Sequence, residues 1–468
     1  MEMMKINYYN FERIESGEYL LTNDLGQYAF LSASDFYCLL KARDSLNSEL
    51  KEELTEKGFL IQSSEEKFLN SEKYKYRDIK NYLFAGPALH IFVVSNECNF
   101  SCVYCQANNG TRLYSHMNED ITKKAVDIAL SSPNEQLTFE FQGGEPLTNF
   151  SAIKNIIEYT EKNKKKKKIS YTLVSNLTLL DEEMIRWIKD YNIGVSTSID
   201  GDELLHNNNR PFISGCGTYQ TTVEKMMRLK KMNIAVGAIQ TTTRQSLNRS
   251  KEIIASYINL GLSDIFIRPL TPLGCAKKRW QEIGYTSEEF LSFYKEIFHY
   301  ILLQNLSGNQ IRENYATIIL KKIMMHHSVN YMELRSPCGG TMGQIAYYPN
   351  GDIFTCDEGR MLYEMGDSTF KLGNVANTVY NDIICSKTAK ALCTASVLEA
   401  QPSCCSCVYQ PFCGTCPIIN YALYGDILPK SVGNYKCKIN KGILDFLFSF
   451  LHKKDDKIMD IFRKWCEE

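Results

Sequence analysis

The sequence lacks three features that would place the protein on a nucleic acid, in a membrane or outside the cell. Its 53 Lys and Arg residues are balanced by 54 Asp and Glu residues, so charge favours neither a nucleic acid nor a membrane surface as partner. The longest apolar runs, such as "LHIFVVS" and "ILDFLFSFL", are far shorter than the ~18 residues of a membrane span. The start "MEMMKINYYN" lacks the basic, apolar and small-residue order of a secretory signal. We therefore expect a cytoplasmic protein with no nucleic-acid and no membrane partner.

Cysteine, by contrast, is abundant. The chain has 17 cysteines in 468 residues, and in a reducing compartment most of them will not form disulfides, which favours metal-binding or catalytic roles. Three lie within residues 98–105, and a second dense group extends from Cys338 to Cys437. The scattered ones are expected to be small buried apolar residues: Cys38, Cys216, Cys275, Cys385, Cys393 and Cys466.

The length suggests two or three domains, and residues 1–75 form the first expected unit. Apolar and polar residues alternate on both sides of the turn signal "NDLGQ", which predicts a β-hairpin. Two helices should follow, the first capped by Ser32 or Ser34 and the second ending at Gly58. A hairpin with helices predicts a winged-helix-like module, and the polar residues 61–78 after it are interpreted as a linker.

Residues 85–275 alternate β-rich and helical segments. The expected strands lie at 89–95, 137–144, 169–177, 193–200, 234–243 and 264–270, with helical patterns between them. Six such repeats predict an α/β fold, a parallel sheet curling into a partial (β/α)6 TIM-like barrel. Active sites of such sheets lie on the loops that leave the carboxyl ends of the strands. Helices are expected to bridge residues 276–335, a cysteine-rich region follows at 336–440, and C-terminal helices at 441–468.

The first expected strand leads directly into "CNFSCVYC", which places Cys98, Cys102 and Cys105 at C-x3-C-x2-C spacing. A [4Fe–4S] cluster takes one thiolate on each iron, so three cysteines leave one iron open for a small molecule with two donor atoms. The alternatives are a zinc loop short of one ligand, or three cysteines that happen to be buried together.

This spacing, with an aromatic residue before the third cysteine, resembles the signature of the radical S-adenosylmethionine (SAM) superfamily. The resemblance implies that SAM chelates the open iron and is cleaved to a 5′-deoxyadenosyl radical. It also implies a set of SAM-binding residues at the ends of the strands: Tyr104 near the adenine, Gly143, Gly144, Glu145 and Pro146 in "GGEP", Ser175 and Asn176 in "VSN", Ser198 and Asp200 in "TSIDG", and Arg210 for the carboxylate.

The second cysteine group resembles the SPASM extension of radical SAM peptide maturases, which carries two auxiliary [4Fe–4S] clusters. The resemblance assigns Cys338, Cys356 and Cys416 to the first auxiliary cluster and Cys404, Cys407, Cys413 and Cys437 to the second, so that the protein holds three clusters in all. Only two residues separate Cys413 from Cys416, where three are more common, and the extra Cys405 makes the assignment ambiguous by one position. The fourth site of the first auxiliary cluster is either open or filled by another cysteine. A zinc ribbon is the alternative for this region.

Asp357 directly follows Cys356, where an aspartate of the sulfatase-maturing relatives acts as general base. The resemblance makes Asp357 the candidate catalytic residue and Glu358 a weaker competitor. The plain alternative for Asp357 is a helix cap or a surface charge.

Phrases from "LLTNDLGQYAFLSASDF" to "CVYQPFCGTCP" resemble the His-Xaa-Ser system radical SAM maturase family over most of the chain. This implies an oxidoreductase that modifies a ribosomally made precursor peptide, by a C–C or C–S side-chain crosslink. The N-terminal module would then be a PqqD-like element that captures the leader as an added strand, and a flavodoxin- or ferredoxin-type protein would donate electrons. A formylglycine-forming sulfatase maturase and a non-catalytic metal-binding scaffold remain the rival interpretations.

Overall fold

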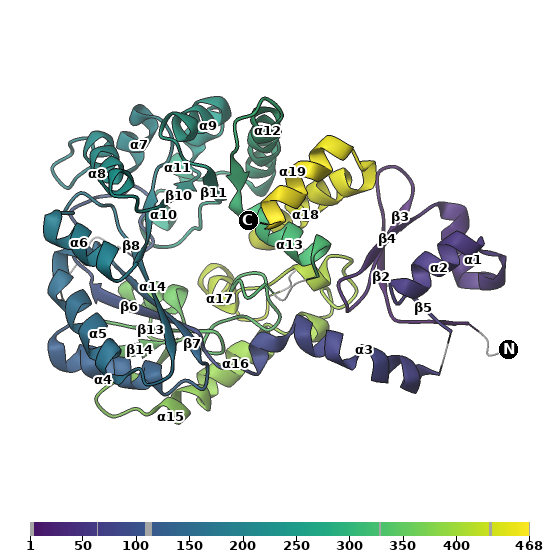
Figure 1. The fold of residues 1–468 in the computed structure, drawn as a ribbon, viewed down its shortest axis with the longest axis horizontal. Coiled ribbons are helices and arrows are strands. Elements are labelled where there is room, and N and C mark those ends of the chain that lie inside the picture. Colours follow the sequence, from purple (N-terminus) through teal and green to yellow (C-terminus); the bar gives the residue numbers. More distant parts are fainter. Residues whose placement is uncertain (1–3, 63, 108–114, 327–328, 430–432, 468) are drawn as a thin grey trace.

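The computed structural model describes residues 4–62, 64–107, 115–326, 329–429 and 433–467 (Figure 1). No helix in these ranges combines the length and the hydrophobicity that crossing a membrane requires.

A mixed ten-stranded sheet forms the centre of the molecule, in the order β12-β11-β10-β9-β8-β7-β6-β13-β14-β15. The six strands that the sequence predicts all form and run parallel, and a short β12 extends their far edge. These strands are β6 (Leu89–Ser95), β7 (Gln136–Gly143), β8 (Lys168–Val174), β9 (Gly194–Ser198), β10 (Val236–Thr241), β11 (Asp264–Arg268) and β12 (Arg312–Glu313).

The cysteine-rich region supplies the other three strands of this sheet. These are β13 (Gln344–Tyr347), β14 (Asp352–Phe354) and β15 (Lys371–Asn374). β13 pairs in parallel with β6, and β14 and β15 follow as antiparallel strands. The region that the sequence sets apart as residues 336–440 is thus joined to the barrel strands by backbone hydrogen bonds, a long-range pairing with no local signal.

Side chains that alternate along each strand give the sheet two different faces. Phe92 and Val94 of β6 pack with the helices in the main core, whereas Ile91 and Val93 join Ala346 and Phe354 on the other side. Strand β6 is therefore buried on both faces, which explains its continuous apolar run.

Helices connect the parallel strands, and their N-caps follow the expected chemistry. Asn118, Asp181 and Asp202 each accept a hydrogen bond from the backbone of the helix that they cap. Thr286 and Glu289 form a capping box at the start of the long α12. The helices are α4 (Glu119–Leu130), α5 (Phe150–Asn163), α6 (Glu182–Asp190), α7 (Glu203–Asn209), α8 (Tyr219–Lys231), α9 (Ser250–Asn259), α10 (Gly274–Lys278), α11 (Trp280–Ile283), α12 (Ser287–Leu306) and α13 (Asn314–Met324).

The N-terminal part contains more structure than the expected hairpin and helices. A three-stranded antiparallel sheet forms in the order β2-β3-β4, and β1 pairs with β5. Ser32, not Ser34, caps α1, and the stretch interpreted as a linker folds into the 15-residue helix α3. The elements are β1 (Lys5–Ile6), β2 (Asn10–Arg13), β3 (Tyr19–Thr22), β4 (Tyr28–Leu31), α1 (Ala33–Lys41), α2 (Ser48–Glu56), β5 (Leu60–Ile61) and α3 (Glu65–Ile79).

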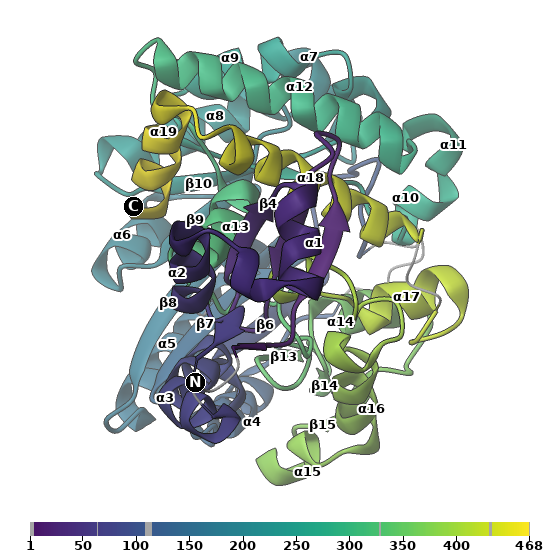
Figure 2. The ribbon, with the colours of Figure 1, turned by 90° about the vertical axis from the view of Figure 1, so that its right-hand side faces the viewer.

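The C-terminal helices connect this N-terminal part to the body. Helix α18 (Tyr435–Lys453) lies against the β2–β4 sheet, with the Phe448 ring centroid 5.4 Å from that of Tyr28 (Figure 2). The other face of the sheet packs on α1 through Leu21, Leu31 and Phe36. The remaining helices are α14 (Asp357–Glu364), α15 (Tyr380–Ile384), α16 (Lys387–Ala395), α17 (Pro417–Tyr424) and α19 (Asp456–Glu467). Six short 3-10 helices complete the described elements: η1 (Arg43–Ser45), η2 (Asn81–Leu83), η3 (Pro146–Asn149), η4 (Arg244–Ser246), η5 (Leu398–Ala400) and η6 (Gln410–Phe412).

Candidate active site

The three-cysteine loop leaves the carboxyl end of β6 and is held by backbone hydrogen bonds from two distant segments. Ser101 N donates to Pro211 O at 2.8 Å, and Val103 N donates to Asn209 O at 2.9 Å. On the other side, Cys275 N donates to Cys105 O at 2.9 Å. The loop therefore has a defined shape set by α7 and α10, which flank it.

The three cysteines face a common cavity of about 510 Å³. Burial raises the pKa of the Cys102 thiol, and the nearby Cys105 and Cys98 raise it further. The structure thus places the three cysteines that the sequence groups together along one cavity.

Gly143 and Gly144 bring the β7 backbone against the start of the cysteine loop. A Cβ added at Gly143 would lie 1.9 Å from Ser95 O, and one at Gly144 would lie 2.3 Å from Glu97 O. Gly144 N donates to Ser95 O at 2.9 Å, and Glu145 N to Glu97 O at 2.7 Å. Only glycine permits this approach, which leaves both residues lining the cavity.

Glu145 lies behind the cavity wall, where its side chain ties β7 to β8. The carboxylate is fully buried and accepts from Ser175 Oγ at 2.7 Å, Asn176 N at 2.7 Å and Leu147 N at 3.0 Å. Burial raises the pKa of Glu145 to about 7, although these hydrogen bonds lower it. Pro146 is buried as the first residue of η3. Both residues thus shape the loop and do not line the cavities found in the described residues.

Ser175, Asn176 and Ser198 line a smaller pocket of about 130 Å³ that continues from the cysteine loop past Gly143. Asn176 Nδ2 donates to Asn99 Oδ1 at 2.8 Å, which couples the end of β8 to that loop. The three residues at strand ends that the sequence singles out therefore meet in one place.

A buried charged cluster holds Arg210 at the mouth of this pocket. Arg210 Nε donates to both carboxylate oxygens of Asp200 at 3.2 Å, and the Tyr104 hydroxyl donates to Asp200 Oδ2 at 2.7 Å. The Arg210 guanidinium carbon lies 5.0 Å from the centre of the Tyr104 ring. Burial alone would lower the pKa of Arg210, but Asp200 raises it above its usual value, so the guanidinium stays charged.

Asp200 occupies a different place from the one expected. The sequence suggests that it faces the cavity with Ser198, whereas the structure buries it completely beneath Arg210. Arg210 and Tyr104 line the cavity in its stead, and Asp200 positions them.

The cysteine-rich region reaches the same cavity. Cys338 and Cys416 line it, and Cys356 is the N-cap of α14. Burial raises the pKa of the Cys356 thiol, as do Glu358, Cys416 and Cys338.

The four cysteines that the resemblance assigns to the second auxiliary cluster lie near the N-terminal part. Burial raises the pKa of Cys407 to about 11, and Cys413 and Cys437 add to this rise. Cys404 starts the same loop, where Cys407 N donates to Cys404 O at 3.0 Å. The Cys405 thiol donates to Pro402 O at 3.5 Å, and its carbonyl accepts from Tyr8 Oη at 2.8 Å.

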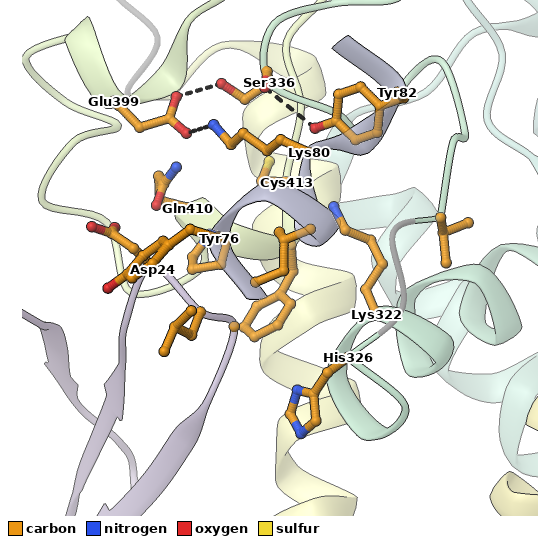
Figure 3. A pocket seen from close by; sticks show the side chains of 16 residues that line it. Asp24, Tyr76, Lys80, Tyr82, Lys322, His326, Ser336, Glu399, Gln410 and Cys413 are labelled. Carbon is orange, nitrogen blue, oxygen red and sulfur yellow. Dashed lines mark hydrogen bonds and ion pairs between the residues drawn. The ribbon is translucent and has the colours of Figure 1, made fainter. Parts of the chain in front are cut away.

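A second cavity, of about 230 Å³, lies beside Cys413 where three parts of the chain meet (Figure 3). Asp24 and Tyr76 come from the N-terminal part, Lys322 from α13, and Glu399 and Gln410 from the cysteine-rich region. Lys80, the Glu399 carboxylate and the Ser336 hydroxyl form a chain of polar contacts across its upper side (Figure 3).

Asp357 lines the main cavity as the first residue of α14. Its carboxylate forms an ion pair with Arg360, a buried arginine of the same helix. Arg360 Nε and Nη1 are buried without a hydrogen-bond partner among the described residues.

Sequence reasoning missed a charged bridge between the barrel and the cysteine-rich region. Glu333 accepts from Arg268 Nη2 at 2.5 Å and from Lys436 Nζ at 2.9 Å. Burial alone would raise the pKa of Glu333, but the charges of Lys436 and Arg268 lower it to about 2. None of the three residues belongs to a motif, and only Arg268, at the carboxyl end of β11, has a position that could have suggested it.

Among the described residues, no three His, Cys, Asp or Glu side chains are arranged to bind one metal ion. Thiolates on one zinc converge within about 2.3 Å of the metal, whereas thiolates of a cluster sit on separate irons. The Cys98–Cys105 loop faces a cavity and lies beside the backbone of Gly143 and Gly144, which we call the glycine cradle. This arrangement fits an iron–sulfur cluster with bound SAM.

The comparisons agree with this geometry. A model of the radical SAM superfamily matches residues 92–251. An uncharacterized protein of Methanocaldococcus jannaschii is 33% identical over 217 residues, which are 46% of this chain and 73% of that protein. The chain belongs to the radical SAM superfamily and is an enzyme.

Characterised relatives extend the similarity beyond that domain. Radical SAM cyclopropyl synthase TigE of Paramaledivibacter caminithermalis is 25% identical over 334 residues, 66% of each chain. A cysteine-type anaerobic sulfatase-maturating enzyme of Clostridium perfringens is 24% identical over 310 residues, 64% of this chain and 80% of that enzyme.

Solved structures show the same fold. The anSMEcpe structure with bound AdoMet and Kp18Cys peptide has a TM-score of 0.67 at 21% identity and covers 78% of this chain and 98% of that one. Streptococcus suis SuiB bound to precursor peptide SuiA has a TM-score of 0.53 at 15% identity and covers 91% of this chain and 98% of that one.

The Asp200–Arg210 pair provides a test of the site. Asp200→Asn leaves a buried guanidinium without its counter-charge, so we expect a loss of about 3 kcal/mol in the free energy of unfolding and weaker SAM binding. Denaturant unfolding and equilibrium SAM binding to the anaerobically reconstituted protein measure the two effects. The control Asp202→Asn replaces a neighbouring carboxylate that caps α7 by an amide that caps equally well, so we expect only the small loss from its partly exposed ion pair with Arg249. Equal effects of the two substitutions would contradict a special role for Asp200.

Proposed function

We propose that the protein is a radical SAM maturase that modifies a ribosomally made precursor peptide, by forming a C–C or C–S crosslink between side chains. One observation carries this proposal. A single cavity is lined by the Cys98–Cys105 loop and its glycine cradle on one side and by Cys338, Cys416 and Asp357 on the other.

Each residue at the SAM end has a separate task. The thiolates of Cys98, Cys102 and Cys105 would hold three irons of the cluster. Gly143 and Gly144 offer backbone groups at close range, and Ser175, Asn176 and Ser198 offer polar groups in the adjoining pocket. Arg210 presents a charged guanidinium suited to a carboxylate. When bound there, SAM and the cluster supply the 5′-deoxyadenosyl radical that abstracts hydrogen from substrate carbon.

The far end of the cavity would receive the peptide. Cys338, Cys356 and Cys416 would hold one auxiliary cluster beside it, and Cys404, Cys407, Cys413 and Cys437 a second one toward the N-terminal part. A flavodoxin- or ferredoxin-type protein would donate the electrons. A cavity of about 510 Å³ admits a few residues of an extended peptide and no folded protein.

The N-terminal sheet would capture the leader of the precursor along β2. In the described residues β2 pairs with β3 alone, so one of its edges is left for an added strand. Phe11 on this edge strand is 50% exposed, and its ring lies 4.9 Å from that of Phe36. The peptide complexes of anSMEcpe and SuiB support a peptide partner.

Formylglycine formation in a sulfatase is the second candidate, favoured by the similarity to sulfatase-maturating enzymes. The N-terminal sheet opposes it, because a leader-binding strand edge has no evident use with a sulfatase substrate.

Anaerobic reconstitution tests the radical chemistry. With dithionite and SAM, we expect 5′-deoxyadenosine from the wild-type protein and none from Cys102→Ala, whose open cluster loses a ligand. Liquid chromatography with mass spectrometry measures the nucleoside, and Cys216→Ala, at an exposed position, is the control. A wild-type protein that binds iron but yields no nucleoside would exclude the proposed enzyme and leave the metal-binding scaffold.

Co-expression with short candidate precursor peptides encoded near this gene tests the substrate. We expect the peptide to lose the mass of one hydrogen pair per crosslink and the added charge of Phe11→Glu to prevent this, while Phe11→Leu preserves it. Because Phe11 is half exposed, both variants should fold and still cleave SAM. Full processing by Phe11→Glu would mean that the leader does not use the β2 edge.

Asp357→Asn tests the general base. We expect this variant to cleave SAM at the wild-type rate and to form less than about 1% of the product, because a general base contributes on the order of 10²–10⁴-fold. Asp367→Asn, beyond the end of α14, is the matched control and should form product normally. Unchanged product from Asp357→Asn would remove this residue from the mechanism.

A further inference from the structure

The first auxiliary set provides one ligand fewer than a closed cluster needs. A [4Fe–4S] cluster held entirely by protein takes four ligands, and this set contains Cys338, Cys356 and Cys416. The question is which group faces the fourth iron.

Glu358 lies at the right place for this role. It is the second residue of α14, directly after the turn that begins at the N-cap Cys356. It lines the main cavity together with Cys338 and Cys416. Glu358, Cys338 and Cys416 therefore line one cavity although they come from three separate stretches of the chain, and Cys356 lies two residues before Glu358.

Neighbouring candidates for the fourth ligand are already engaged or do not reach this wall. Asp357 forms an ion pair with Arg360, and Glu333 is paired with both Arg268 and Lys436. Glu358 has no ion pair with any residue in the part of the chain that the structure describes. Cys393, on α16, does not line the cavity in that part of the chain.

We propose that Glu358 is the fourth protein ligand of the first auxiliary cluster, binding iron through a carboxylate oxygen. This inference rests on the proposed function, because it requires that the three thiolates hold a cluster. Glu358 would then be the only carboxylate among the four protein ligands. Loss of this carboxylate should release one iron and leave a three-iron cluster.

The test compares clusters directly and needs no substrate. In a background with Cys98, Cys102 and Cys105 replaced by Ala, only the auxiliary clusters remain. The protein is reconstituted without small thiols, which could fill an open iron, and is studied by iron analysis, Mössbauer spectroscopy and electron paramagnetic resonance. We expect Glu358→Gln to lose one iron per chain and to show a [3Fe–4S] signal after oxidation.

Three matched variants make the result specific. Glu358→Cys should restore the four-iron cluster, because a thiolate replaces the carboxylate at the same place. Asp357→Asn and Cys393→Ser should leave iron content and spectra unchanged. A four-iron spectrum in Glu358→Gln identical to that of the unmodified background, or loss of iron in Cys393→Ser alone, would overturn the assignment of Glu358. If the unmodified background binds no auxiliary iron, the proposed function fails and this inference fails with it.

Discussion

The parallel pairing of β13 with β6 is the contact on which the site depends. Gln344 to Tyr347 pair with Leu89 to Phe92, so the strand that leads into the first cysteine loop also carries the cysteine-rich region on its other edge. Without this pairing, the two cysteine regions would belong to separate units with a surface between them. With it, both open onto one cavity.

Buried charge then gives the cavity its shape. Asp200 holds Arg210 and Tyr104 at one end, and Glu333 joins Arg268 to Lys436 at the other. Each acid is paired, as burial requires, because an unpaired ion in a low-dielectric site is strongly destabilising. The buried carboxylate of Glu145 is stabilised by hydrogen bonds, because it accepts from three donors in the loops that it connects. The side chains that line the cavity are therefore held in position by buried residues such as Asp200 and Glu145.

The N-terminal part makes direct contacts with the cysteine-rich region and with helix α18. Thr22 Oγ1 donates to Val408 O at 2.6 Å in a buried contact, and Glu12 pairs with Lys441 of α18 at 2.7 Å. A peptide held at the β2 edge would thus be fixed relative to the cysteine-rich region, and the second cavity beside Cys413 lies at the same junction.

The sequence by itself determined the elements whose cause is local. The alternation of strands and helices from β6 to β11 follows from hydrophobic periodicity, Ser32 and Gly58 mark helix ends by their backbone preferences, and the C-x3-C-x2-C spacing singles out the loop of Cys98, Cys102 and Cys105. It could also place Gly143, Ser175, Ser198 and Arg210 at one edge, because the carboxyl ends of parallel strands meet there. Only the tertiary structure decided that β13 joins β6, that Asp200 and Glu145 support the wall from behind, and that Glu358 and Glu333 face the cavity. These features arise from contacts between residues far apart in the chain, which no local pattern encodes. They also depend on burial, which separates the carboxylates that line the cavity from those that hold other residues in place behind its wall.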